Sequence, residues 1–337
     1  MTKQKTQPIL VDNFGRQVTY VRMSITDRCD FRCVYCMDEE MTFMPRQQLL
    51  TLEEIVYLLS AFTELGVEKV RITGGEPLVR RDADWLFAQL GQLKQNSQLK
   101  ELTLTTNGSQ LPKYAQSLVQ SGVDRINISL DSLKADRFKQ LTRIGELEKV
   151  LAGIEAAKAA GFKRIKLNAV IMKGRNEDEI VDLAMFAINN GLDISYIEEM
   201  PLGHVTHERG ESYCSSDEVL KALQSKLDLQ TSIVNTGGPS RYYQVMGSDS
   251  KIGFISPHSH NFCESCNRVR VTTEGRLLLC LGQEHSVDLR EIIRNHPNDK
   301  ARLKQAIIDS MQIKPKGHDF NVNEQPIIFR HMSVTGG

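Results

Sequence analysis

Residues 21–36 read Val21-Arg-Met-Ser-Ile-Thr26-Asp-Arg-Cys29-Asp-Phe-Arg-Cys33-Val-Tyr-Cys36. Apolar and polar side chains alternate over residues 21–26, which is the pattern of a β-strand with two different faces. Three cysteines spaced C-x3-C-x2-C follow directly. In barrels of parallel strands, active sites lie at the carboxyl ends of the strands. This stretch therefore predicts a strand that carries a cysteine cluster into a site of chemistry.

The same strand pattern recurs up to residue 200, each time followed by a helical pattern. Two N-terminal capping boxes, Thr51 with Glu54 and Asn176 with Glu179, mark predicted helix starts. Alternating strands and helices favour parallel pairing with right-handed crossovers. Six units fall short of the eight that close a barrel, so we predict an α/β fold with a partial (β/α)6 TIM-type barrel. The predicted strands are residues 21–26, 69–73, 101–106, 125–130, 164–172 and 194–199.

The repeat ends after Met200. Beyond it we predict a helix over 216–228, short strands and turns over 231–280, and a final helix near 287–310. The chain therefore divides into a barrel, residues 1–204, and a C-terminal extension, residues 205–337, that closes the open barrel.

Each predicted strand has one polar and one apolar face. Helices outside a barrel cover the apolar face, so the polar face should point into the lumen. Other barrels fill the lumen with branched aliphatic residues; a polar lumen therefore predicts a polar, anionic ligand. An antiparallel sheet with one solvated face would alternate in the same way, but the repeat disfavours it. The inward residues are Arg22, Ser24, Thr26, Arg71, Thr73, Thr103, Thr105, Asn107, Asn127, Ser129, Asp131, Lys166 and Asn168.

The 337 residues contain 42 Lys+Arg and 42 Asp+Glu, so the formal net charge is zero. This balance argues against a globally basic nucleic-acid binder. No stretch has the roughly 18 consecutive apolar residues of a membrane span, and the first residues do not resemble a signal peptide. We expect a cytoplasmic protein that binds neither nucleic acid nor membrane, with thiolates in place of disulfides.

The seven cysteines fall into two sets of three with one bystander, Cys214. The first cysteine set is Cys29, Cys33 and Cys36. Three thiolates can hold three irons of a [4Fe–4S] cluster and leave the fourth iron open for a ligand, whereas a cluster that only transfers electrons usually has four cysteines. A structural zinc site needs four closed ligands, and no fourth Cys or His lies nearby.

The second cysteine set, Cys263, Cys266 and Cys280, has the spacing C-x2-C-x13-C. It can hold a second cluster with an open iron, but here zinc stays an alternative, because a histidine could supply the fourth ligand. Cys214 stands apart and is interpreted as a packed or surface residue. The candidate histidines are His258, His260 and His285.

The C-x3-C-x2-C set with Tyr35 before its last cysteine, followed by Gly74-Gly75-Glu76-Pro77 after the second strand, resembles the radical S-adenosylmethionine (SAM) superfamily. The resemblance implies that the first cluster chelates SAM through its open iron. It also implies that SAM contacts Tyr35, Gly75, Ser129 and Met200.

The run Cys263-Glu-Ser-Cys266-Asn-Arg268-Val-Arg270 with distant Cys280 resembles the GTP 3′,8-cyclase family of molybdenum-cofactor biosynthesis, from Arg22 to Gly336-Gly337. In this family the second [4Fe–4S] cluster binds guanine, and the C-terminal Gly-Gly reaches the active site. Arg268 and Arg270 are also candidate catalytic residues. The implied GTP contacts are Arg22, Arg71, Thr105, Lys166, Arg268, Val269 and Arg270.

The resemblance implies a lyase that cyclises GTP to 3′,8-cyclo-7,8-dihydro-GTP by radical SAM chemistry. It implies an electron donor such as flavodoxin or ferredoxin, and cyclic pyranopterin monophosphate synthase as the next enzyme. We expect a monomer or a homodimer. The chain departs from the family at Asp38, where proline is usual, and in the pair Glu198-Glu199, where an aromatic residue is common.

Three alternatives are weighed against this interpretation. A radical SAM enzyme could act on a peptide, although the cationic lumen and a second set of three cysteines argue against that substrate. A zinc-dependent nucleic-acid or partner-binding module is disfavoured by the balanced charge. A non-catalytic iron–sulfur redox sensor would not cleave SAM.

Overall fold

The computed structural model of the chain describes residues 10–234, 237–324 and 328–336. Within these residues the strands form one 12-stranded sheet in the order β12-β11-β10-β1-β2-β3-β4-β5-β6-β9-β8-β7. Its central strands β1 to β6 follow the chain order, and each pairs in parallel with the next. The prediction of an α/β fold with a mainly parallel sheet is confirmed. The six strands are β1 (Tyr20–Ser24), β2 (Lys69–Thr73), β3 (Glu101–Thr106), β4 (Arg125–Ser129), β5 (Ile165–Val170) and β6 (Asp193–Ile197).

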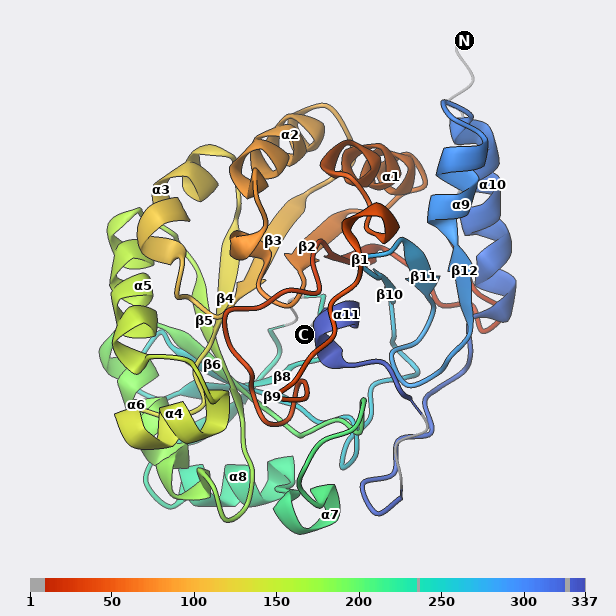
Figure 1. Ribbon diagram of the computed structural model, residues 1–337. Coiled ribbons are helices and arrows are strands. Elements are labelled where there is room, and N and C mark those ends of the chain that lie inside the picture. Colours follow the sequence, from red (N-terminus) through yellow and green to blue (C-terminus); the bar gives the residue numbers. More distant parts are fainter. Residues whose placement is uncertain (1–9, 235–236, 325–327, 337) are drawn as a thin grey trace.

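Helices connect these strands and lie along the outer side of the sheet (Figure 1). The apolar faces of the strands pack against them: Val21, Ile72 and Leu104 are fully buried. This burial of apolar area is the main stabilising contribution. The helices are α1 (Leu52–Glu64), α2 (Ala83–Gln95), α3 (Leu111–Gln120), α4 (Ala135–Thr142), α5 (Leu147–Ala159) and α6 (Ile180–Asn189).

One of the two predicted capping boxes is confirmed. Thr51 Oγ1 accepts a hydrogen bond from Glu54 N at 3.1 Å, and Glu54 Oε2 accepts one from Thr51 N at 2.7 Å. The prediction at Asn176 is wrong, because its side chain bonds the backbone of Met172, Val170 and Asp131 instead of capping a helix. A buried amide that finds tertiary partners no longer caps its own helix.

The C-terminal region adds strands to both edges of the parallel core. β9 pairs in parallel with β6, and β10 pairs in parallel with β1. The predicted helix near 287–310 is two helices, because Pro297 lacks the N–H that a continuous helix requires. These elements are α7 (Arg209–Ser212), α8 (Ser216–Gln224), β7 (Leu229–Ser232), β8 (Arg241–Val245), β9 (Lys251–Ile255), β10 (Arg268–Val271), β11 (Arg276–Leu278), β12 (Ser286–Asp288), α9 (Leu289–Asn295), α10 (Lys300–Ser310) and α11 (Met332–Thr335).

The predicted division of the chain into residues 1–204 and residues 205–337 stays a prediction.

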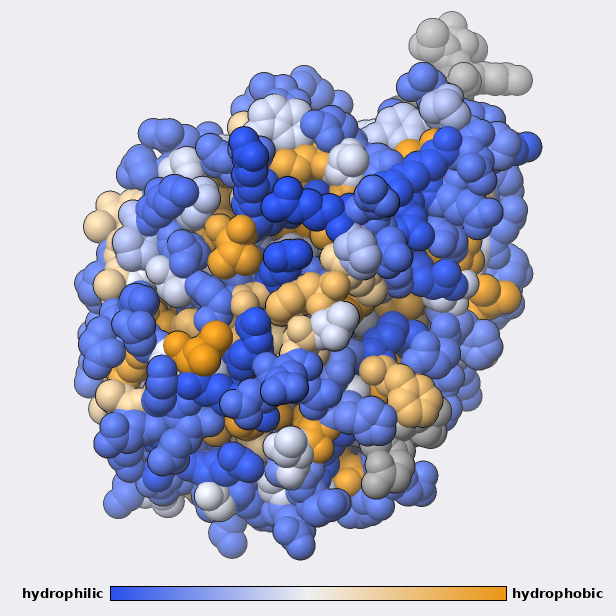
Figure 2. Space-filling view, in the orientation of Figure 1, coloured by the Kyte–Doolittle hydropathy of each residue, from blue (hydrophilic) through white to orange (hydrophobic). Residues whose placement is uncertain are grey.

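Hydrophobic residues gather around the centre of the face in Figure 2, and hydrophilic residues surround them. In the part of the chain that the structure describes, none of the helices has the length and apolar character of a membrane span.

Helix α5 packs so closely on the loop after β3 that a methyl group at Gly153 would lie 2.1 Å from the carbonyl oxygen of Gly108. Helix propensity alone predicts that Gly153→Ala stabilises the protein. We expect instead a loss of about 1–3 kcal/mol, because overpacking a rigid contact forces backbone shifts. A lowered midpoint in thermal unfolding checks this, and a raised midpoint would contradict it.

Candidate active site

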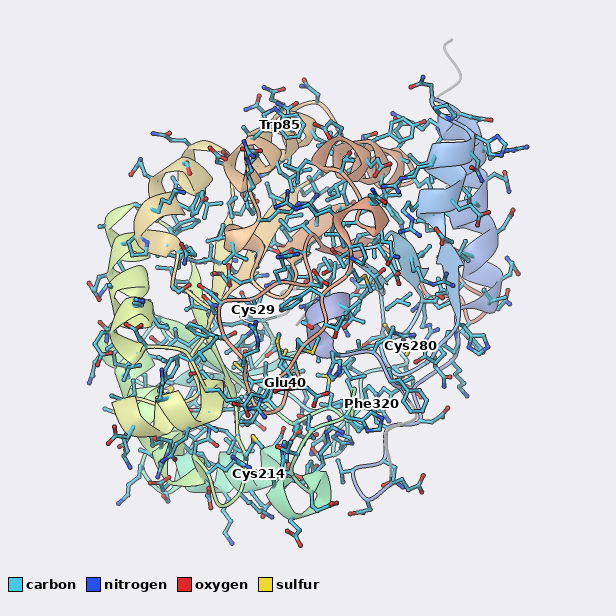
Figure 3. The ribbon with its side chains drawn as sticks, in the orientation of Figure 1. Cys29, Glu40, Trp85, Cys214, Cys280 and Phe320 are labelled. Carbon is cyan, nitrogen blue, oxygen red and sulfur yellow. The ribbon has the colours of Figure 1, made fainter. Side chains whose placement is uncertain are left out.

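The first cysteine set lies in the loop after β1, with its thiols unpaired and half-buried. Cys29 lies inside the ring of helices, whereas Trp85 lies on the outside (Figure 3). Burial raises the pKa of all three thiols, so ligand binding at these sulfurs has to displace protons.

Backbone contacts with the Gly74-Gly75 turn hold the start of this loop. Gly75 N donates to Thr26 O at 2.7 Å, and Glu76 N donates to Arg28 O at 2.8 Å. A Cβ at Gly75 would lie 2.4 Å from Arg28 O. The glycines are therefore required for the close approach of two backbone segments, in addition to any approach to a ligand.

Glu76 and Tyr35 connect the cysteine loop to neighbouring strands. The Glu76 carboxylate is buried and accepts hydrogen bonds from Leu78 N, Thr106 Oγ1 and Asn107 N at 2.6–3.0 Å. Burial raises the pKa of Glu76 to about 8. Tyr35 donates to Asp131 Oδ2 at 2.7 Å, and burial raises the pKa of Asp131 to about 6.

A cavity on the inner face of the sheet brings the predicted ligand residues together. Of the four predicted SAM contacts, Tyr35, Ser129 and Met200 line it, whereas Gly75 lies in the adjacent loop. The second cysteine set lines the same cavity. All predicted GTP contacts line it as well: Arg22, Arg71, Thr105, Lys166, Arg268, Val269 and Arg270.

The sequence prediction missed several residues that also line this cavity, among them Tyr20, Lys69 and Arg125. Lys69 lies two residues before Arg71, and Arg125 two residues before Asn127. Strand parity therefore places both on the inward face and could have identified them.

Positive side chains stand next to each other across the strands. Arg22 is in register with Arg71 on one side and with Arg270 on the other. Like charges in such positions repel. Burial, together with the charges of Arg71 and Arg268, lowers the pKa of Arg22 to about 10. Burial and the charges of Arg22 and Arg268 also lower the pKa of Arg270.

Protein groups neutralise part of this charge. Glu101 pairs with Lys69 at 2.7 Å and with Arg125 at 2.9 Å. Arg71 donates to the Tyr20 hydroxyl at 2.6 Å and to Thr105 Oγ1 at 3.0 Å. Burial alone would raise the pKa of Tyr20, but Arg71, Arg22 and Lys69 outweigh it and lower the pKa to about 7. The cavity is strongly cationic and suited to a polyanion.

Polar atoms in the cavity also offer hydrogen bonds to a ligand. Among the described residues, the buried atoms Arg125 Nε, Asn127 Oδ1 and Asn168 Oδ1 have no hydrogen-bond partner. Buried polar atoms are nearly always paired, so these atoms fit a polar ligand that provides both donors and acceptors.

Two cationic side chains, Arg16 and Lys314, contact the segments that carry the second cysteine set. Arg16 donates to Cys263 O at 2.8 Å. The buried Lys314 donates to Leu279 O at 2.6 Å and to Arg268 O at 3.0 Å, and its Nζ lies 3.9 Å from Cys266 Sγ. Burial raises the pKa of Cys266, but Arg268 and Lys314 outweigh it and lower the pKa, which favours the thiolate that binds metal.

Two of the histidines considered as a fourth zinc ligand have other partners. His258 Nε2 lies 2.9 Å from Glu199 O, and His260 Nε2 lies 2.8 Å from Asp217 Oδ1. In the described part of the chain, no three His, Cys, Asp or Glu side chains converge on one metal position. The assignment of iron–sulfur clusters therefore rests on the donor chemistry and on the family. Cys214 is a buried core residue.

The C-terminal tail, defined here as residues 328–336, ends in the middle of the molecule (Figure 1). Arg270 Nη1 donates to the carbonyl oxygens of Gly336 and Thr335. Gly336 has a φ of 79°, and a Cβ there would lie 2.1 Å from Thr73 Cγ2. The predicted Gly-Gly end thus has Gly336 beside the cavity, whereas Gly337 lies outside the described residues.

Comparison with known proteins agrees with these features. Residues 23–187 match the Radical SAM superfamily, and residues 192–320 match the family Molybdenum Cofactor Synthesis C. The structure resembles SuiB of Streptococcus suis bound to S-adenosylmethionine, with a TM-score of 0.61 over 95% of this chain and 76% of that chain. At 16% identity this likeness shows the fold alone.

The fold, the cysteine loop and the match to the Radical SAM superfamily together define a radical SAM protein. The chain is 57% identical to the GTP 3′,8-cyclase of Pseudomonas entomophila, over 99% of this chain and 100% of that protein. It is 56% identical to the GTP 3′,8-cyclase of Saccharophagus degradans, over 97% and 98% of the two chains. It belongs to the GTP 3′,8-cyclase family.

Replacing Lys314 tests its contribution to the second cysteine set. Lys314→Met leaves the buried carbonyl of Leu279 and the partly buried carbonyl of Arg268 without this donor, which costs about 1–3 kcal/mol. It also removes a positive charge near Cys266. We expect less iron per chain after anaerobic reconstitution, with the iron at the first cysteine set retained. The matched control is Lys316→Met, because Lys316 is exposed. Equal iron content in both variants would contradict the prediction.

Proposed function

We propose that this protein cyclises GTP to 3′,8-cyclo-7,8-dihydro-GTP with SAM, the first step of molybdenum-cofactor biosynthesis. The observation that carries the proposal is a cationic cavity, which is lined by Arg22, Arg71, Arg270 and the second cysteine set. The loop that holds the first cysteine set lies beside this cavity. Membership of the GTP 3′,8-cyclase family supports it.

The proposed cofactors are SAM and two [4Fe–4S] clusters, one on each cysteine set. Each set offers three thiols, which would leave one iron open for SAM at the first set and for guanine at the second. When bound, the first cluster and SAM supply the electron and the radical that removes hydrogen from C3′ of GTP. Tyr35, Gly75, Ser129 and Met200 are the proposed SAM contacts.

The proposed task of the cationic residues is to bind and orient the triphosphate. Guanidinium groups donate parallel hydrogen bonds to phosphate oxygens. Triphosphate binding would relieve the repulsion among Arg22, Arg71 and Arg270, and thereby fix C3′ and C8 of GTP in one geometry. Arg268 and Arg270 are the proposed catalytic residues, because they closely follow Cys266 in the sequence and line the same cavity as the second cysteine set. Thr105, Lys166 and Val269 complete the proposed GTP contacts.

Several finer features belong to the same proposal. Strands β1–β6 form a partial (β/α)6 barrel, which residues 205–337 close. The protein works in the cytoplasm as a monomer or homodimer, receives electrons from a flavodoxin or ferredoxin, and passes product to cyclic pyranopterin monophosphate synthase.

A peptide substrate is the second candidate, because a SuiB structure with precursor peptide has a similar fold. The cationic cavity favours GTP.

The first test is SAM cleavage by the anaerobically reconstituted protein with dithionite. We expect GTP, but not ATP, to stimulate 5′-deoxyadenosine formation, because the proposed guanine site distinguishes the two bases. Mass spectrometry measures both 5′-deoxyadenosine and the cyclised nucleotide. Cleavage that is indifferent to GTP would contradict the proposed substrate but not the radical SAM class.

A second test removes one inward cation. Lys166 is buried, and Lys166→Met should raise the KM for GTP about tenfold to a hundredfold, the effect of losing one charge-assisted hydrogen bond. The KM for SAM should change little. Lys163→Met is the matched control, since Lys163 is exposed outside the cavity. An unchanged KM for GTP would argue against triphosphate binding at this position.

A further inference from the structure

Glu199, which follows β6, is a buried acid at a place where an aromatic residue is common in the family. Its side chain is 3% exposed. The carboxylate accepts hydrogen bonds from Arg209 Nε at 3.1 Å and from Ser212 Oγ at 3.2 Å, and His207 Nε2 lies 2.9 Å from Oε1. A buried charge is tolerated when it is paired and hydrogen-bonded in this way.

Arg209 extends this network to the backbone beside the C-terminal tail. Its Nη2 donates to Leu202 O at 2.7 Å and to Gly203 O at 3.1 Å. The same two residues bind the tail: Leu202 forms a parallel bridge with Ile328, and Gly203 N donates to Ile328 O at 2.8 Å. Arg209 thus fixes the backbone that receives the tail.

From Ile328 the tail runs along this support toward the cavity. His331 packs so closely on Gly203 that a Cβ added to Gly203 would lie 2.5 Å from His331 Nδ1. His331 Nε2 also lies 3.6 Å from Asp38 Oδ2, in the segment after the first cysteine set. Helix α11 then leads to Gly336, whose carbonyl accepts from Arg270.

The tail cannot hold this position by its own helical structure. Helix α11 has four residues, far below the length at which an isolated helix is stable in water. Its place depends on contacts with the rest of the chain. The backbone of residues 202–203 is the contact nearest its start, and buried ionic hydrogen bonds hold that backbone in place.

We propose that Glu199 and Arg209 form a tail anchor: they are positioning residues that hold the C-terminal tail against Arg270. The anchor also adjoins the proposed SAM site, because Leu202 N donates to Met200 O at 2.8 Å. The effect of the anchor on catalysis rests on the proposed function. Its effect on the position of the C-terminal tail is independent of the proposed function.

Arg209→Lys is the sharpest test, because lysine keeps the charge but loses the planar fork that reaches Glu199 and the two carbonyls together. Glu199→Gln removes the charge and keeps the size. Glu208→Gln is the matched control: Glu208 is an exposed acid in the same loop whose side chain does not cap α7.

Hydrogen–deuterium exchange of the reconstituted full-length protein measures the tail directly. We expect amides in residues 328–336 to exchange about tenfold faster or more in Arg209→Lys and Glu199→Gln, because exchange reports local opening. Glu208→Gln should match the parent protein. Unchanged exchange of the tail in both anchor variants would overturn the proposal, whether or not the protein cyclises GTP.

The ratio of 5′-deoxyadenosine to cyclised nucleotide gives a readout that general destabilisation does not move. We expect this ratio to rise severalfold in the anchor variants, because a displaced tail leaves SAM cleavage possible but misplaces Arg270 relative to GTP. Faster tail exchange with an unchanged ratio would overturn the catalytic part of the proposal. A parent protein that forms no cyclised nucleotide would instead refute the proposed function, and the exchange measurement would still decide on the anchor.

Discussion

Parallel pairing places Arg270, Arg22 and Arg71 side by side on the inner face of β10, β1 and β2. Their mutual repulsion in a buried cavity opposes folding. The opposite faces of the same strands offset it, because residues such as Val21 and Ile72 bury apolar area against the outer helices. The result is a folded protein whose cavity keeps a positive charge that its own side chains neutralise only in part. An anionic ligand would neutralise the remaining charge.

The two cysteine sets are fixed by parts of the chain remote from their own loops. The first set depends on backbone hydrogen bonds to the Gly74-Gly75 turn. The second depends on Arg16 and Lys314, from opposite ends of the chain. The separation of the two proposed clusters is therefore a property of the whole sheet. A ligand held between them needs that rigidity, because its reacting atoms require defined positions.

Strand alternation was sufficient to place Arg22, Arg71, Thr105 and Lys166 on the inner face, and all four line the cavity. It also contained the signal for Lys69 and Arg125, which the prediction overlooked. Local patterns failed where tertiary partners competed with them. Asn176 has the residue type of a helix cap, but it bonds the backbone beside β4 and β5 instead. The attraction of a buried backbone partner cannot be read from a four-residue motif.

The sequence by itself determined the order of strands and helices, the polar inner face and the two cysteine sets. These features follow from a strand period of two residues and from spacings within short segments, both of which are local. The tertiary structure alone decided that β10 pairs with β1, and that Arg209 supports the backbone that receives Ile328. Such contacts join segments far apart in the chain. They depend on which sheet edge and which backbone groups remain available after the core has formed, and no local pattern specifies that choice.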